Sequence, residues 1–242
     1  RRVSPGLGRR GARGILLSLA RERGLYRWDT LNLVNGRVTR GVLFGSTASR
    51  PVFRCSSSRR RVIPGVFRRG RAPAVELRIS SATRRLALPP GTSDAVCSDE
   101  YNRASTLYTL FSQRGRLSVR GYSLKGRRVY TSRSLPRGLR SLQLAVLPRF
   151  GSLKSLPVLA AREGSRLVVL VPHKRGWESF TVAGASATPR SVTSGLQRGA
   201  YRWVAVQNSR GSYFLLKLSA LNRVSSVEPL PGHNRSRSFK LL

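Results

Sequence analysis

The residues of this chain that could do chemistry are arginines placed beside glycines. The first run is Gly8-Arg9-Arg10-Gly11-Ala12-Arg13-Gly14, and similar runs recur along the chain. A guanidinium group binds phosphate through two parallel hydrogen bonds, while glycine lets bare backbone approach the same phosphate chain. This pattern predicts contacts to the phosphates of a nucleic acid.

The overall charge supports the same prediction. The 242 residues include 46 Lys and Arg but only 9 Asp and Glu, for a formal net charge of +37. A compact domain with this charge repels itself strongly unless a polyanion surrounds it, so a nucleic-acid partner is predicted. Arginine dominates over lysine, which fits fixed RNA contacts. GC-rich codon usage would give the same bias, so the bias alone does not choose between the two explanations.

The candidate RNA-binding residues are arginines in clusters, several of them beside glycine. For any single arginine the alternative is a solvated side chain, but clusters favour contacts to phosphate, to 2′-hydroxyl groups and to RNA shape. The candidates are Arg9, Arg10, Arg13, Arg21, Arg23, Arg27, Arg59, Arg60, Arg61, Arg68, Arg69, Arg71, Arg127, Arg128, Arg235 and Arg237.

Enzymatic chemistry is not predicted. The two histidines, His173 and His233, are far apart in the chain, and no carboxylate pair, metal-ligand spacing or nucleophile motif stands out. No cofactor, metal or small-molecule substrate is therefore expected. Cys55 and Cys97 make no disulfide or metal framework by spacing, so we expect free thiols in a reducing compartment.

The elements that must position the arginines are expected to be β-strands. Short runs of Leu and β-branched residues recur, broken by Gly, Pro, Ser and Arg, which is typical of small barrels or sandwiches. Residues 15–20 and 25–34 are predicted strands, and one short helix is expected within 102–111. The longest apolar run, Leu167 to Val171, has the length of a buried strand and is far below the roughly 18 residues of a membrane span. No membrane partner is expected.

The order of several motifs resembles the universal large-subunit ribosomal protein 2 family. The first half contains Gly8-Arg9, Arg13-Gly14-Ile15, Gly24, Tyr26-Arg27 and Asp29, and later Arg71, Val75, Leu77, Arg84 or Arg85, Pro89 and Gly91. The second half contains Pro136-Arg137-Gly138, then nine residues, then Pro148-Arg149-Phe150-Gly151, Ala161-Arg162-Glu163-Gly164, Val168 to Pro172 and Ala187 to Val192. The resemblance covers most of residues 8–91 and 126–192. It fails in 92–125 and near the C-terminus, where Pro231-Gly232-His233 is the trace of a glycine-rich loop.

The resemblance implies an all-β chain with an OB-like barrel followed by an SH3-like barrel; periodicity alone supports only two small β modules. The expected organisation is a basic arm (1–14), an OB-like RNA-binding module (15–91), a linker or insertion (92–125), an SH3-like module (126–206) and a basic C-terminal hairpin and tail (207–242). By resemblance, His233 would lie near the peptidyl-transferase centre.

The expected function is that of a structural constituent of the large ribosomal subunit. The expected partners are large-subunit rRNA and neighbouring ribosomal proteins, and the eroded motifs suggest a mitochondrial-matrix ribosome. The chain has no methionine, so it is expected to follow a removed N-terminal piece. The alternatives are an RNA-packaging virion protein, a lineage-specific mitoribosomal protein and, last, an RNA-modifying enzyme.

Overall fold

The regular elements of this chain are β-strands. The structure is a computed structural model that describes residues 2–7, 14–32, 36–41, 43–46, 48–56, 62–79, 82–98, 104–149, 153–173, 176–182, 188–197, 201–219 and 223–230. Within these ranges there is no helix, so the prediction of an all-β chain is confirmed. It follows that none of these ranges contains a helix long and apolar enough to cross a membrane.

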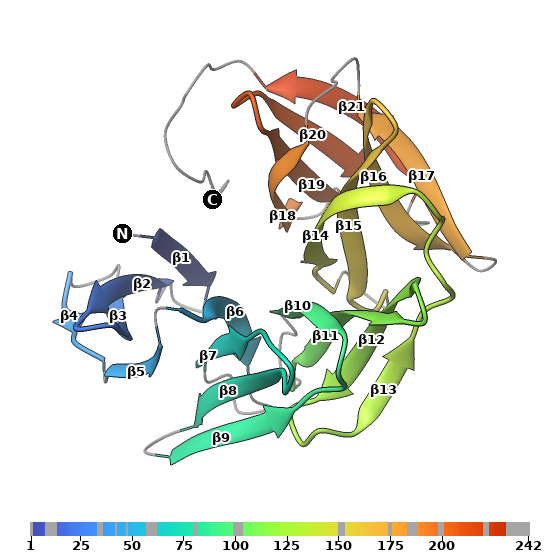
Figure 1. Cartoon of the computed structure of the whole chain (residues 1–242). Helices are drawn as coiled ribbons and strands as arrows, with labels where there is room; N and C mark the ends of the chain where they lie inside the picture. The colour runs from blue at the N-terminus through green and yellow to red at the C-terminus, as the bar shows by residue number, and fades with distance from the viewer. Residues whose placement is uncertain are drawn as a thin grey trace.

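The strands pair into five antiparallel sheets, which we number 1 to 5 in chain order (Figure 1). Sheet 1 contains β1 (Arg2–Leu7), β2 (Gly14–Glu22), β3 (Leu25–Asn32), β4 (Val38–Thr39) and β5 (Leu43–Ser46). Sheet 2 contains β6 (Arg50–Ser56), β7 (Val62–Arg68), β8 (Ala74–Ile79) and β9 (Ala82–Ala87). Sheet 3 contains β10 (Thr92–Cys97), β11 (Thr106–Gln113), β12 (Arg116–Ser123) and β13 (Arg128–Thr131). Sheet 4 contains β14 (Leu139–Leu147), β15 (Leu156–Glu163), β16 (Arg166–His173) and β17 (Gly176–Val182). Sheet 5 contains β18 (Pro189–Gln197), β19 (Tyr201–Asn208), β20 (Tyr213–Leu218) and β21 (Val224–Leu230).

Strands pair with their neighbours in the chain, so sheets 2 to 5 are simple up-and-down meanders. Tight turns set the register of the hairpins. In sheet 1, Glu22 pairs with Leu25 across Arg23 and Gly24, whose φ angles are 49° and 73°. Two consecutive positive φ angles are those of a type I′ turn, whose twist matches the twist of the strands it joins.

The five sheets lie one after another around a common centre (Figure 1). The first strand of each of sheets 2 to 4 contacts the first strand of the next sheet. Cys55 near the end of β6 is bonded to Cys97 at the end of β10, which indicates that these two strands run in the same sense. Four-stranded meanders repeated in this way are the blades of β-propellers.

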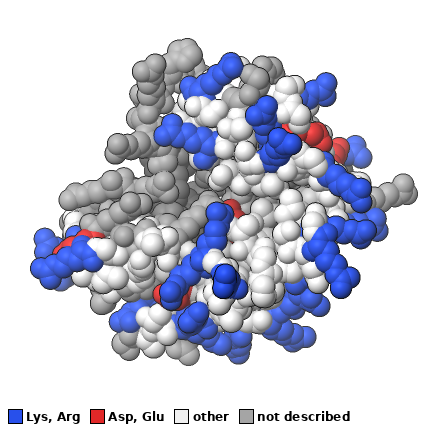
Figure 2. Space-filling model, viewed as in Figure 1, with Lys and Arg blue, Asp and Glu red and all other residues white. Residues whose placement is uncertain are grey.

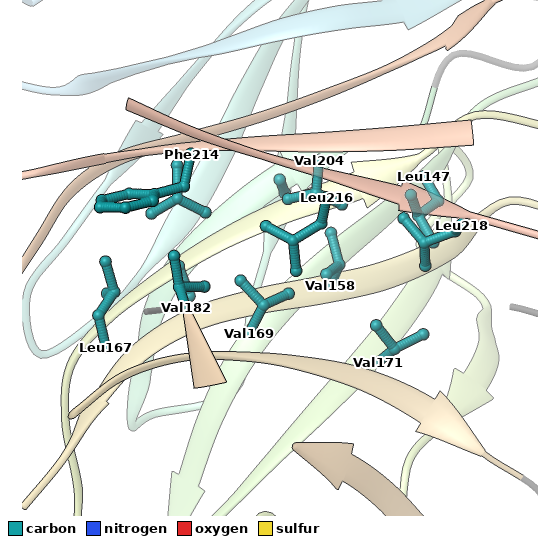
Figure 3. Packing of buried hydrophobic residues seen from close by; sticks show 13 residues of the cluster. Leu147, Val158, Leu167, Val169, Val171, Val182, Val204, Phe214, Leu216 and Leu218 are labelled. Carbon is teal, nitrogen blue, oxygen red and sulfur yellow. The ribbon is translucent and has the colours of Figure 1, made fainter. Parts of the chain in front are cut away.

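The hydrophobic core lies between the sheets. Three clusters of buried side chains fill the interfaces between sheets 2 and 3, between sheets 3 and 4, and between sheets 4 and 5. Figure 3 shows the last of these, where Val169 and Val171 of β16 face Val204 and Leu216 of sheet 5. Sheets 2 to 5 therefore stabilise their neighbours face to face, at roughly 25 cal/mol for each Å² of apolar surface removed from water.

Leu167–Val171 illustrates why the inner blades have continuous apolar strands. Leu167, Val169 and Val171 belong to the cluster shared with sheet 5, whereas Val168 and Leu170 belong to the cluster shared with sheet 3. Because alternate side chains point to opposite faces, a strand packed on both faces loses the polar alternation of a half-buried strand. The predicted buried strand is confirmed.

Two expectations about residues 92–125 are corrected. Residues 92–125, expected as a linker or insertion, include three strands of sheet 3. The short helix expected within 102–111 is wrong from Thr106 onward, because Thr106–Gln113 is β11 and pairs on both sides. An OB-like barrel over 15–91 followed by an SH3-like barrel is not confirmed, since 15–91 contributes to two separate sheets.

The expectation of free thiols is also wrong. Cys55 and Cys97 form a disulfide with a Cα–Cα distance of 5.0 Å, and both side chains are buried. The bond joins the first strands of sheets 2 and 3 within their shared core. A separation of 42 residues brings the two cysteines together only because consecutive blades stack.

Candidate nucleic-acid interface

Because neighbouring strands alternate in direction, the blades have two ends. One end holds the turn between the second and third strand of each sheet, together with the connections between sheets, and we call it the turn end. A set of ten exposed arginines lies there, with members on every sheet. They are Arg23, Arg68, Arg69, Arg71, Arg114, Arg116, Arg133, Arg137, Arg166 and Arg210.

Four of the arginines predicted from sequence belong to this set, and two of them have fixed partners. Arg68 forms an ion pair of 3.0 Å with Glu76. Arg69 donates two hydrogen bonds, of 2.6 and 3.2 Å, to the carbonyl oxygen of Ser93 at the start of sheet 3. Both side chains remain exposed, so the contacts hold these guanidinium groups in place at the surface without removing them from solvent.

Arg27 has a different environment from its neighbours. Its guanidinium group is half-buried and contacts both Glu22 and Asp29, with 2.9 Å from Nε to the Asp29 carboxylate. Burial alone would raise the pKa of Asp29, but hydrogen bonds from Arg27 and from the backbone N–H of Gly41 lower it overall. Arg27 therefore already has two carboxylate partners, which makes it a weaker candidate for phosphate binding than the arginines of the turn end.

Acidic groups in the described ranges are largely engaged within the fold. Asp94 is buried and accepts hydrogen bonds from the backbone N–H groups of Ala95 and Leu144. Glu228 pairs with Lys217 at 2.6 Å, and this contact lowers the pKa of Glu228. On the face shown in Figure 2, basic side chains are spread around the molecule and acidic ones are few. The exposed arginines thus leave an excess of positive charge at the surface.

The other predicted residues divide into three groups. Arg127 and Arg128 are exposed, but they follow the turn between β12 and β13 at the opposite end of sheet 3. Arg21 pairs with Tyr26 through its backbone in β2. The remaining candidates lie outside the described residues; they are Arg9, Arg10, Arg13, Arg59, Arg60, Arg61, Arg235, Arg237 and His233.

Sequence reasoning missed the turn-end arginines of sheets 3 to 5. Two signals could have found them. Arg114-Gly115 repeats the Arg23-Gly24 arrangement, with positive φ at both residues between two strands. The first strands of sheets 2 to 5 also begin at intervals of 42, 47 and 50 residues. A repeat at this period is typical of propeller blades.

A metal site or a histidine-based catalytic site has little support in the described part of the chain. There, no three side chains of His, Cys, Asp or Glu gather as metal ligands. His173 is exposed at the end of β16.

Arg202 is the charged residue most deeply buried in the described ranges. It lies in β19 and is 1% exposed. Its Nη1 donates a bond of 3.3 Å to the carbonyl oxygen of Lys154, while Nε and Nη2 have no partner. Burial lowers the pKa of Arg202, because the charged form loses its hydration. This site costs stability, because no carboxylate of the described residues pairs with the guanidinium group.

Replacing Arg202 with methionine is therefore expected to stabilise the fold. Removing a buried, unpaired charge should raise the free energy of unfolding by about 1–3 kcal/mol. Urea denaturation measures the change. Arg190→Met, at an exposed position of sheet 5, removes the same charge from the surface and controls for the general relief of repulsion. Equal effects of the two substitutions would contradict a specific cost at Arg202.

Comparisons with known proteins bear on the fold. No family model and no curated protein matches this chain. Among solved structures, it resembles AofleA from Arthrobotrys oligospora, solved as a mutant with three arginines changed to alanine. The TM-score is 0.59 at 12% identity, and the match covers 94% of this chain and 72% of AofleA. A weaker match, from a study of two prolyl endopeptidases, has a TM-score of 0.45 at 13% identity and covers 90% of this chain and 33% of the other. The first match supports the fold, and the second carries no argument.

Proposed function

We propose that this chain binds RNA as a structural protein, through arginines that its blades carry at the turn end. The observation that supports the proposal most is the set of ten exposed arginines there, on all five sheets. Salt-dependent neutralisation of phosphates needs many cationic side chains on a rigid surface, and does not need a pocket or a catalytic group.

The scaffold suits this role because its turns are short and are flanked by paired strands. Arg23 and Arg114 are each the first of the two central residues of a type I′ turn, where the flanking hairpin holds the backbone. A side chain anchored on such a turn loses less conformational entropy on binding than one on a long loop. The repeated blades thus present guanidinium groups at several points of one surface.

A place in the large ribosomal subunit, as one copy among neighbouring ribosomal proteins, is the more specific form of the proposal. It rests on the order of sequence motifs and not on the geometry of the sheets. Its two-barrel form requires strands of 15–91 to pair into one closed barrel, whereas the strands of this range pair into two separate sheets. A single copy bound to rRNA in large-subunit particles would support the ribosomal assignment, whereas symmetric self-assembly around RNA would favour a packaging protein.

The disulfide bears on the proposed compartment. Disulfides persist mainly where the surroundings are oxidising, and they are rare where thiols are kept reduced. The bond between Cys55 and Cys97 therefore favours an oxidising compartment over the reducing one predicted from the sequence. Thiol labelling of the protein in its own cells, before and after reduction, tests this point, and a location in the mitochondrial matrix stays a prediction.

RNA binding is expected to weaken steeply with salt. For a fluorescent fragment of large-subunit rRNA, the logarithm of the binding constant should fall by roughly 0.7–0.9 for each tenfold rise in salt and each phosphate neutralised. Fluorescence anisotropy over a series of salt concentrations measures the slope. Polyglutamate of matched charge serves as the control anion. It should compete poorly because bidentate pairing is geometrically specific and its carboxylates are not spaced as the phosphates of RNA are. A flat salt response, or equal competition by polyglutamate, would refute the proposal.

A further inference from the structure

Two adjoining hollows lie at the turn end of sheet 3, with volumes of about 380 and 560 Å³. Their walls are the turn between β11 and β12 and the connection from β13 to β14. The two hollows share Arg116 and Ser134, which therefore stand between them. We call the pair the sheet-3 groove. Its polar lining residues are Gln113, Arg114, Arg116, Ser118, Ser134 and Arg137.

The groove has the chemistry of an anion site. Three arginines line it, Arg114, Arg116 and Arg137, and all three are exposed. None of the lining residues is acidic, so their charge is not compensated from within the groove. The hydroxyl groups of Ser118 and Ser134 add neutral donors. Phosphate oxygens accept several such bonds at once, and charge-assisted bonds of this kind are about twice as strong as neutral ones.

The walls of the groove are held by the backbone. Leu135 donates to the carbonyl oxygen of Leu117 at 2.7 Å, and Ser132 donates to that of Val119 at 2.8 Å. Leu135 and Leu139 are buried in the core between sheets 3 and 4. The connection that carries Arg137 is therefore fixed along the edge of β12, which keeps Arg137 near Arg116 before any ligand binds.

The aromatic residue of the groove is not free to stack on a base. Phe111 is 5% exposed, and the guanidinium carbon of Arg120 lies 3.6 Å from the centre of its ring. Arg120 in turn lies 3.4 Å from the side-chain oxygen of Gln113. The face of the ring is already occupied, so recognition in this groove would depend on phosphate and not on base identity.

We infer that the sheet-3 groove is a primary binding site for the phosphate backbone of a single RNA strand, read without sequence preference. This inference rests on the proposed RNA binding and locates one part of it. A basic groove without acidic lining residues can follow a phosphate backbone, and contacts to phosphates do not depend on the sequence of bases. The remaining arginines of the turn end then add weaker, distributed contacts.

The test removes two charges from the groove and two from a matched position. Arg116→Gln with Arg137→Gln changes the groove, while Arg84→Gln with Arg85→Gln changes two exposed arginines of β9. Both double variants carry the same net charge. The probe is a short fluorescein-labelled oligo(U), followed by anisotropy as a function of salt, with thermal unfolding as the check of folding. The groove variant should bind about 10- to 100-fold more weakly, with a salt slope reduced by roughly 1.4.

The outcomes separate the groove from RNA binding in general. The β9 variant should lose less than about threefold in affinity and keep the wild-type slope. Equal losses in the two variants would overturn the groove assignment and leave the proposed RNA binding intact. Absence of salt-dependent binding by the wild-type chain would refute both. A strong preference among oligo(U), oligo(A) and oligo(C) at the wild-type groove would contradict backbone recognition.

Discussion

Reducing the disulfide between Cys55 and Cys97 is expected to lower the free energy of unfolding by about 4 kcal/mol. The bond closes a loop of 42 residues, and in the chain-entropy description a loop of this length restricts the unfolded chain by about that amount. The two sulfur atoms also lie in the core between sheets 2 and 3, next to Phe67 and Leu107. Urea denaturation with and without a phosphine reductant measures the difference.

A variant without the bond separates the cross-link from packing. Cys55→Ala with Cys97→Ala should be destabilised by at least as much as the reduced wild type, and the reductant should not affect it. If the reduced and oxidised wild-type proteins unfold at the same urea concentration, the cross-link does not stabilise this fold. Since the bond joins consecutive blades, we expect reduction to destabilise both sheets together and not to release a single strand.

Replacing Gly91 with alanine is expected to cost about 2–4 kcal/mol, from backbone strain and a steric clash together. Gly91 lies in the connection between β9 and β10 at a φ of 91°, which strains any residue with a side chain. A Cβ atom there would lie 2.3 Å from the backbone oxygen of Ser112, so the connection or β11 would have to move. The hydrogen bond of 3.0 Å from Ser112 N–H to the Gly91 carbonyl oxygen would be disturbed as well.

Gly126→Ala is the matched control for the steric part of this effect. Gly126 has nearly the same φ, 89°, but a Cβ atom there would meet only Leu86 at 3.9 Å, an ordinary contact. This variant should lose about 1 kcal/mol, from backbone strain alone. Chemical denaturation of both variants gives the comparison. Equal destabilisation would show that Ser112 can move without a cost in stability, and that the close approach of Gly91 to β11 does not constrain the residue at position 91.

Several features of the fold follow from local sequence. Alternating and short apolar runs predict strands, and strands are what form, because the side-chain period of two is a property of the chain itself. The turn at Arg23 and Gly24 also follows from local sequence, because it lies between two of the predicted strands. The charge of +37 likewise predicts a polyanion partner, because net charge is a sum over residues and does not depend on how the strands pair.

Sheet 3 shows where local reasoning ends. Leu107 packs toward sheet 2, while Tyr108 and Leu110 pack toward sheet 4. Because both faces of β11 are buried, its sequence has no alternation of apolar and polar residues, and the local pattern favours a helix there. The three acids within 92–125 also favour a linker, although Asp94 is buried and bonded to the backbone of β14.

The candidate site divides in the same way. From the sequence alone it follows that arginines, several of them beside glycines, carry most of the charge of this protein, and Arg23, Arg68, Arg69 and Arg71 are predicted as RNA-binding residues. The folded structure adds that Arg27 is matched by Glu22 and Asp29, that Arg116 and Arg137 line one groove, and that Cys55 is bonded to Cys97. Composition and turn chemistry are local, whereas these pairings depend on how consecutive blades stack, which no short stretch of sequence encodes.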